Sequence, residues 1–374
     1  MNKALAELIS ISNSLGGAPS LVIGSAGNTS IKTPDGKFMY IKASGIALKD
    51  MTASSGWRRL QLDRAKAVLD DKSLTRLDML ERHEKVTLGI LSACDDKFSE
   101  KNKPSIESCF HTILGRYVIH LHPAALLASA CSEKGRSKLD RIFKYENIIP
   151  LWVPYAGHGY ELACTIRKLS AAYGKKFARL PNIIILQNHG LLVTADTAGK
   201  AVGLIKRITR VCEMNFTKIK PVKPLLCPDK VITETCSIVR DALFRLTAKK
   251  FTIEYYMDGT IAAFLHIPNA HRVSSGLITP DEFLYANGPA VWLARTDKKY
   301  IHEKLKEEIK KRRMTPLAFI VKNTGLFIAH DKNKHRLIKD IVVSHLSIRA
   351  FAAGMGRVIR ISKKQRELLY LTKG

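Results

Sequence analysis

The sequence predicts an α/β protein in which a layered α/β/α domain is followed by a smaller second α/β domain. Three observations favour this organisation. Strand and helix patterns alternate through residues 1–220, three prolines fall between residues 219 and 229, and one segment of the first domain recurs in the second. Because clustered prolines interrupt helices and strands, we expect domains at 1–220 and 230–374, joined by a proline-rich linker at 221–229.

Each expected element follows from the spacing of its apolar residues and from the helix and strand breakers beside it. In the first domain we expect strands at 21–23 and 38–42, a helix at 76–93, a helix start at 104–107, strands at 116–122 and 148–154, a helix at 160–173, two strands within 182–195 and a helix at 196–218. Beyond the linker we expect a helix at 230–247, strands at 251–256 and 260–265, further helix, strands within 317–329 and two closing helices.

The recurring segment lies late in each domain. Ile183–Asp196 matches Ala318–Asp331 without a gap, at a constant offset of 135 residues (318 minus 183). We hypothesise that the second domain is a diverged, degenerate copy of part of the first. Thr324 stands where the first segment has His189, so the copy would lack the chemistry of that histidine. Two unrelated strand–turn–strand units that share an Asn-x-Gly turn are the alternative.

The chain is strongly basic, since 61 Lys and Arg against 33 Asp and Glu give a formal charge of +28. Such a charge attracts anions in general, including phosphorylated metabolites and nucleic acids, and does not choose between them. Basic clusters such as Lys310–Arg313 and Lys363–Lys364 are typical of solvated helix faces, and no nucleic-acid-binding motif accompanies them. Nucleic acid is therefore not expected as a partner.

The seven cysteines are scattered, and no two of them form a C-x-x-C pair. Free thiols in apolar surroundings indicate a reducing compartment, so we expect a cytoplasmic protein. No apolar stretch reaches the roughly 18 residues of a membrane span, and the N-terminus shows no secretory signal. Membrane contact is not expected.

The first candidate functional group is His120-Leu121-His122, on the strand expected at 116–122. Residues two apart on a strand point to the same face, and zinc and similar divalent metals accept imidazole nitrogens. His189, at the hinge between two apolar strands, is a third candidate ligand. The alternatives are ordinary polar residues at a strand end and a histidine that hydrogen-bonds within its own turn.

Glu107 lies one helix upstream of the histidine pair, where a carboxylate can move protons on a metal-bound substrate. A helix-start glutamate stabilised by the helix dipole is the alternative. The small-residue loop Gly24–Ser30, the turn Ala43–Gly45 and Ser105 can present donors to a phosphate, although each alone is equally consistent with a simple turn. The loop matches neither a P-loop nor GxGxxG, so no dinucleotide site is expected.

In this order, the motifs resemble those of the class II aldolase/adducin family over about residues 5–220. The resemblance rests on five motifs: Gly27-Asn28-Thr29-Ser30, Lys42-Ala43-Ser44-Gly45, Pro104-Ser105-Ile106-Glu107, His120-Leu121-His122-Pro123 and Gln187-Asn188-His189-Gly190. The whole chain looks most like the aldolase portion of rhamnulose-1-phosphate aldolase/alcohol dehydrogenase-type proteins. No Rossmann fingerprint follows it here, so no nicotinamide activity is expected.

The resemblance implies a three-layer α/β/α fold around a central, mostly antiparallel sheet, assembled as a tetramer. Matched by position, it implies a divalent metal, zinc or a similar ion, on His120, His122 and His189, with Glu107 as the catalytic acid/base. It implies a phosphate pocket at Gly27, Asn28, Ser44, Gly45 and Ser105. Ile106 departs from the pattern of fuculose-1-phosphate aldolases, which often have a second serine there, and this puts one phosphate contact in doubt.

The reaction implied by the resemblance is cleavage of a ketose 1-phosphate, a phosphorylated sugar, into dihydroxyacetone phosphate and an aldehyde. Glu107 stands where pentulose-5-phosphate 4-epimerases have aspartate, and adducin lacks the histidine set, so an aldolase is favoured. A metal-dependent sugar-phosphate dehydratase, a decarboxylating relative, and a non-catalytic adducin-like or nucleic-acid-associated protein are the alternatives.

Overall fold

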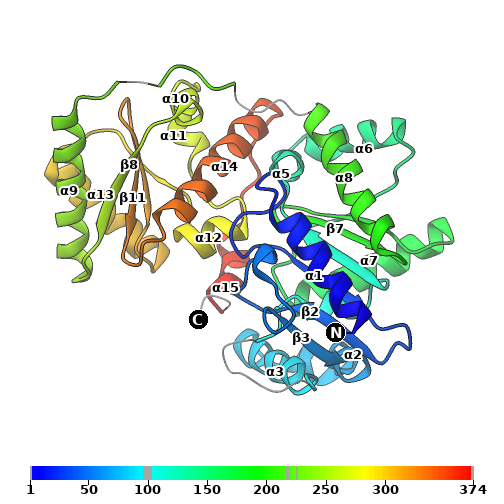
Figure 1. The fold of residues 1–374 in the computed structure, drawn as a ribbon. Coiled ribbons are helices and arrows are strands. Elements are labelled where there is room, and N and C mark those ends of the chain that lie inside the picture. The colour runs from blue at the N-terminus through cyan, green and yellow to red at the C-terminus, as the bar shows by residue number, and fades with distance from the viewer. Residues whose placement is uncertain (1, 96–102, 216–219, 225, 372–374) are drawn as a thin grey trace. The chain divides into compact units, whose positions relative to one another are not determined.

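The computed structural model describes residues 2–95, 103–215, 220–224 and 226–371, and their contacts divide the chain into two compact units (Figure 1). As far as they are described, unit 1 comprises Met1–Ala130, Ser137–Asn215 and Ser362–Gly374, and unit 2 comprises Cys131–Arg136 and Phe216–Ile361. The end of the expected first domain (216–219), position 225 of the expected linker and the last three residues of the expected second domain lie outside the described residues. No helix in the described part of the chain is long and apolar enough to cross a membrane.

Unit 1 is built on a mixed sheet with the strand order β3-β2-β1-β4-β7-β6-β5. Its strands are β1 (Asn28–Lys32), β2 (Phe38–Lys42), β3 (Trp57–Gln61), β4 (Tyr117–Leu121), β5 (Leu151–Val153), β6 (Ile183–Leu186) and β7 (Gly190–Ala195). Every neighbouring pair is antiparallel except β5 and β6, which are parallel. The predicted fold class, a central and mostly antiparallel sheet in an α/β domain, is confirmed.

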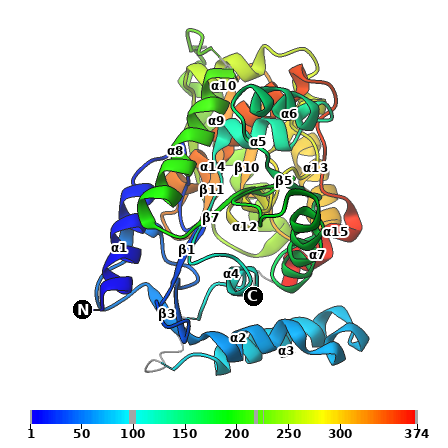
Figure 2. The ribbon, with the colours of Figure 1, turned by 90° about the vertical axis from the view of Figure 1, so that its right-hand side faces the viewer.

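Helices cover both faces of this sheet (Figure 2). They are α1 (Lys3–Gly16), α2 (Leu62–Asp70), α3 (Met79–Ser92), α4 (Ser108–Thr112), α5 (Ala124–Ala130), α6 (Gly135–Tyr145), α7 (Tyr160–Phe177), α8 (Ala198–Asn215) and α15 (Lys363–Leu371). On one face, α2, α3, α4 and α7 enclose a core that includes Ile41, Val118 and Leu192. On the other face, α1, α5 and α8 pack against β1, β4 and β7. Because β4 lies between two layers of helix, all five of its residues are buried.

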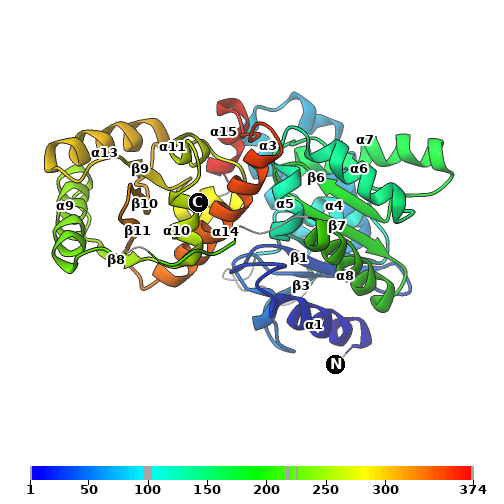
Figure 3. The same cartoon turned by 90° about the horizontal axis from the view of Figure 1, so that it is seen from above.

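Unit 2 has a four-stranded sheet in the order β8-β11-β10-β9. Its strands are β8 (Thr252–Tyr256), β9 (Val291–Leu293), β10 (Ala318–Val321) and β11 (Gly325–His330). Its helices are α9 (Asp229–Thr247), α10 (Gly259–Leu265), α11 (Ala270–Val273), α12 (Pro280–Ala286), α13 (Lys298–Arg312) and α14 (His335–Gly354). One apolar core lies between the sheet and α9 and α13, and a second lies between the sheet and α10, α12 and α14 (Figure 3).

The sheet of unit 2 repeats half of the sheet of unit 1, strand for strand. In the β6–β7 hairpin Ile183 pairs with Val193, and in the β10–β11 hairpin Ala318 pairs with Ile328, so both partners are shifted by 135 residues. The parallel neighbours β5 and β9 occupy the same place, and β4 and β8 pair with β7 and β11 in the same register. This agreement, which extends well beyond one Asn-x-Gly turn, supports the hypothesis of a diverged copy.

The repeat also locates the second unit's counterparts of the histidines. His120 lies opposite Leu192 in unit 1, and Tyr255 lies opposite Phe327 in unit 2, 135 residues later in each case. Thr324 corresponds to His189, and the Tyr255 hydroxyl donates a hydrogen bond to its carbonyl oxygen over 2.9 Å. A tyrosine therefore occupies the position where unit 1 has an imidazole.

Two sequence-based expectations of secondary structure are wrong. Residues 21–23 are not a strand but form turns, with Leu21 N–H bonded to Ala18 O. Residues 260–265 form helix α10, because the Asp258 side chain caps the N–H groups of Thr260 and Ile261. A short apolar run suits a buried helix as well as a strand, and the cap decides between them.

The two units also depart from the expected domain boundaries. The final helix, α15, packs against α3 in unit 1. Conversely, the 131–136 segment belongs to unit 2, where Ile359 N–H donates to Cys131 O over 2.8 Å and Arg357 pairs with Glu133 over 2.8 Å. Side-chain and backbone pairing, which composition does not reveal, sets these boundaries.

Candidate metal centre

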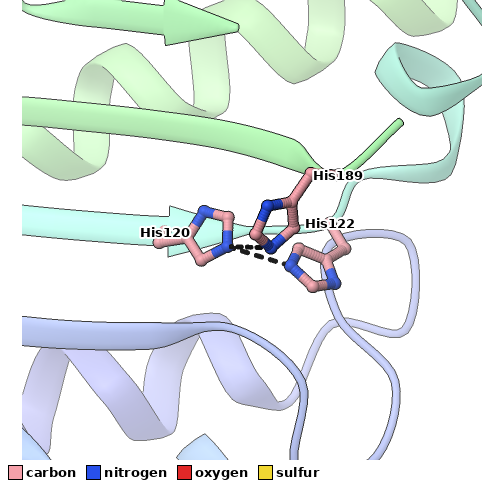
Figure 4. A group of neighbouring side chains, drawn as sticks. All are labelled: His120, His122 and His189. Atoms are coloured by element: carbon pink, nitrogen blue, oxygen red, sulfur yellow. Dashed lines mark hydrogen bonds between the residues drawn. The ribbon is translucent and has the colours of Figure 1, made fainter. Parts of the chain in front are cut away.

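Three imidazoles from two neighbouring strands meet at one end of the unit 1 sheet (Figure 4). His120 is on β4, His122 follows the end of β4, and His189 lies in the β6–β7 turn. The Nε2 atom of His120 lies 3.0 Å from His122 Nε2 and 3.3 Å from His189 Nε2. The strand pairing of β4 with β7 therefore brings together two motifs that are separated by 69 residues.

The hydrogen bonding of His120 fixes its tautomer. Its Nδ1 atom lies 3.1 Å from the carbonyl oxygen of Leu191, which can only accept, so Nδ1 carries the proton and Nε2 presents a lone pair. A metal-bound histidine typically donates its other N–H to such an acceptor. Burial lowers the pKa of His120 well below its usual value, and burial also lowers the pKa of His189, so both rings favour the neutral, ligating form.

Glu107 lies beside the histidines at the start of α4 and is 6% exposed. Its Oε1 atom lies 3.1 Å from His189 Nε2, and its Oε2 atom lies 3.5 Å from His120 Nε2. Burial alone would raise the pKa of this carboxyl, but interactions with His120 and His189 outweigh burial and hold the pKa well below its usual value. Glu107 is therefore ionised at neutral pH and faces the point where the three imidazoles converge.

A buried chain of hydrogen bonds orients Glu107. The Asn28 amide nitrogen donates to Glu107 Oε2 over 2.7 Å and lies 3.3 Å from the Ser105 hydroxyl. The Asn28 carbonyl oxygen lies 2.5 Å from His111 Nε2, and His111 Nδ1 lies 2.7 Å from Ser30 Oγ. Because the amide oxygen can only accept, His111 must donate from Nε2, and this fixes the Asn28 amide with its N–H groups toward the carboxylate.

The residues expected to bind phosphate fall into two groups. Gly27, Asn28 and Ser105 are buried beside the histidine cluster, whereas Ser44 and Gly45 lie on an exposed turn. Backbone pairing connects the two groups, because Ser105 N–H donates to Lys42 O and Ser44 N–H donates to Lys103 O. The Ser44 N–H is therefore already bonded, which leaves its hydroxyl as the group that can face a ligand.

A buried cation supports this turn. Lys42 Nζ donates to the carbonyl oxygens of Ser25 (3.1 Å) and Ile46 (2.7 Å), so it joins the glycine-rich loop after residue 23 to the 43–46 turn. Burial lowers the pKa of Lys42 to about 8, although the Glu107 charge acts in the opposite direction. The lysine is still mostly protonated at neutral pH and places positive charge beneath the two loops.

The donor set fits a divalent metal. The ligand atoms of His120, His122 and His189 all lie within 4.8 Å of one another. Nitrogen lone pairs that converge in a buried site repel one another unless a cation neutralises them, and three imidazoles with an open fourth position are a common zinc donor set. Glu107 Oε1 and His189 Nδ1 are buried and have no hydrogen-bond partner among the described residues. These residues are able to hold a metal ion.

Residues that sequence reasoning missed also lie in this cluster. His158, between β5 and α7, lies 3.6 Å from Glu107 and forms a second possible metal-ligand group with Glu107 and His189. Nothing in its Gly-His-Gly context separates it from a loop histidine, so only the fold reveals it. Of the two tyrosines considered as catalytic acids but not assigned, Tyr145 is 84% exposed, whereas the Tyr155 hydroxyl is buried and the charge of Glu107 acts on its pKa.

The comparisons with known proteins agree with this site and fold. The profile of the family described as class II aldolase and adducin N-terminal domain matches residues 6–216, and the chain belongs to this family. A curated relative, the uncharacterized oxidoreductase YuxG of Bacillus subtilis (strain 168), is 25% identical over 305 residues, which are 76% of this chain and 41% of that protein. The chain thus spans less than half the length of this relative.

Solved structures with the same fold include two class II aldolase proteins. One is the N-terminal class II aldolase domain of a conserved protein from Thermoplasma acidophilum (23% identity, TM-score 0.47, covering 57% of this chain and 94% of that one). Another is described as L-fuculose 1-phosphate aldolase (18% identity, TM-score 0.40, covering 62% of this chain and 94% of that one).

Proposed function

We propose that this chain is a divalent-metal-dependent aldolase that cleaves a ketose 1-phosphate into dihydroxyacetone phosphate and an aldehyde. One observation carries the proposal: an ionised, buried Glu107 lies against three convergent imidazoles, with Oε1 free of hydrogen bonds among the described residues. A metal site that bound only for structure would need no such unpartnered carboxylate oxygen beside it. Family membership and the fuculose-phosphate aldolase among proteins of similar fold are consistent with this activity.

His120, His122 and His189 would hold the ion, zinc or another divalent metal, and when bound it would supply Lewis-acid polarisation of the substrate carbonyl. Glu107 moves the proton at C3. Cleavage of the C3–C4 bond leaves its electron pair on C3 as an enediolate, and the carboxyl group, once protonated, delivers a proton there. Asn28 bonds only Oε2 of Glu107, so Oε1 is available for this transfer.

The phosphate would bind where positive charge and hydrogen-bond donors meet. Lys42 provides the charge, and the Asn28 amide and the hydroxyls of Ser44 and Ser105 provide donors around it. Gly27 and Gly45 have positive φ angles of 68° and 77°, which let the two loops turn back toward each other. Anchoring the phosphate holds C3 and C4 in fixed positions relative to Glu107.

The proposal is tested by Glu107→Gln. Glutamine retains an oxygen that accepts the Asn28 hydrogen bond, so metal content and folding should be unchanged. Without an ionisable group, release of dihydroxyacetone phosphate should fall by about 10²–10⁴-fold. Glu84→Gln, an exposed change on α3, is the matched control and should keep full turnover. Unchanged turnover in Glu107→Gln would rule out its acid/base role.

Product analysis separates the remaining functions. A dehydrated sugar phosphate or carbon dioxide from the wild-type protein would replace the aldolase with a dehydratase or a decarboxylating relative. Absence of bound metal after reconstitution, together with no turnover, would favour an adducin-like binding protein. Steeply salt-dependent binding of generic DNA would indicate a nucleic-acid partner instead.

The expected tetramer and cytoplasmic location are part of the same proposal. Light scattering coupled to size-exclusion chromatography tests the first. A mass of one chain would remove the tetramer, and the activity of that monomer would show whether the site depends on a second subunit.

A further inference from the structure

His158 is held against the metal centre by two glycines. Gly157 and Gly159 have φ angles of 81° and 60°, a backbone conformation that other residues rarely adopt. A Cβ at Gly159 would lie 3.2–3.3 Å from the side chain and carbonyl oxygen of Ile106, the residue before Glu107. Glycine therefore allows the two segments to pack closely, and the buried His158 side chain, 8% exposed, faces Glu107 as a result.

The two ring nitrogens of His158 have different surroundings. Nδ1 lies 3.6 Å from Glu107 Oε1, and the ring packs edge-on against His189, with centroids 4.8 Å apart. Nε2 is buried and has no hydrogen-bond partner among the described residues. The side chain also lines a cavity with Arg82, Tyr160, Glu161 and Leu368. A buried imidazole nitrogen without a partner is costly, which indicates that a ligand atom binds there.

Retro-aldol cleavage requires two proton transfers, and Glu107 accounts for only the one at C3. The hydroxyl on C4 must also lose its proton as its oxygen becomes the aldehyde carbonyl. Tyr155 is near, but burial and the Glu107 charge raise the pKa of this phenol, so it stays protonated and cannot accept a proton. Lys42 is a cation bound by carbonyl oxygens. A neutral imidazole, by contrast, is a proton acceptor.

We propose that His158 is a second catalytic residue, which accepts the proton of the C4 hydroxyl at Nε2; this inference rests on the aldolase function proposed above. The O–H bonding pair becomes the second bond of the aldehyde C=O. The C3–C4 pair passes to C3, and C3 takes a proton from Glu107. Nδ1 of the resulting imidazolium faces Glu107 Oε1 and returns a proton to it, so both residues regain their starting states without an added co-reactant.

The test separates the two proton transfers. Exchange of the hydroxymethyl hydrogen of dihydroxyacetone phosphate with deuterated water needs the C3 transfer alone, whereas cleavage needs both. We expect His158→Gln and His158→Phe to keep full metal content, by mass spectrometry, and to exchange this hydrogen within about threefold of the wild-type rate. Both should cleave ketose 1-phosphates about 10²–10⁴-fold more slowly. Glutamine still forms hydrogen bonds, so its failure to rescue cleavage would identify proton acceptance as the missing function.

His302→Gln, on helix α13 of unit 2, is the matched control and should change nothing. The inference is overturned if either folded His158 variant cleaves at the wild-type rate. It is equally overturned if exchange falls together with cleavage, or if metal is lost, because His158 would then act on Glu107 or on the metal. A wild-type protein that neither exchanges this hydrogen nor cleaves would instead refute the aldolase function itself.

Discussion

Gly190 is the position where one added methyl group tests the metal centre most directly. A Cβ there would lie 2.5 Å from Leu121 O, 2.7 Å from His122 Cδ2 and 3.1 Å from His120 Cε1. Since ordinary van der Waals contact begins at 3.4 Å, the turn or the end of β4 must move by about 0.9 Å (3.4 minus 2.5). Metal–ligand distances tolerate only about 0.2 Å. Gly190→Ala should therefore separate His189 from the β4 histidines.

We expect Gly190→Ala to bind Zn²⁺ roughly 10–100-fold more weakly, the loss typical when support of the ligands is removed. Overpacking should also lower the free energy of unfolding by about 1–3 kcal/mol. Calorimetric titration of the metal-stripped protein with Zn²⁺ and urea unfolding measure the two effects. Gly203→Ala is the control: its Cβ meets nothing within 4 Å, and alanine in helix α8 should stabilise by about 0.5–1 kcal/mol. Wild-type Zn²⁺ affinity in Gly190→Ala would refute the reasoning.

Two further predictions concern stability. Arg349, 1% exposed, donates to both carboxylate oxygens of Glu282 over 2.7–2.8 Å. Arg349→Met should destabilise unit 2 by about 3–5 kcal/mol in urea unfolding while the folded protein keeps its metal, because a buried carboxylate loses its partner; unfolding at the wild-type urea concentration would contradict this. Burial lowers the pKa of His111 from 6.5 to about 3, so below pH 6.5 the unfolded chain binds a proton that the folded chain does not. Stability should therefore fall with pH in this range, by about 2 kcal/mol at pH 5 (1.5 pH units times 1.36), and His111→Gln should flatten that fall. An equally steep profile in the variant would show that His111 is not the cause.

The secondary structure was predictable where local signals agreed and failed where they competed. The strand Phe38–Lys42 has the predicted bounds, since turn residues flank a short apolar run on both sides. The 260–265 run has the same composition as a strand, but the Asp258 cap makes it a helix. Helix α15 was expected, but its packing on unit 1 was not, because its partner α3 lies far away in the sequence.

The sequence by itself determined the family, the fold class and the repeat, because ordered motifs and a constant offset survive divergence as local patterns. It also singled out His120, His122, His189 and Glu107 as residues of the right chemistry. Only the tertiary structure placed their ligand atoms within a few ångströms, since strand register joins β4 to β7. Only it revealed His158, which has no signal of its own: two glycines and the packing of Gly159 on Ile106 bring this imidazole to the carboxylate. Chemistry is written in residue types, but proximity arises from pairing between distant segments.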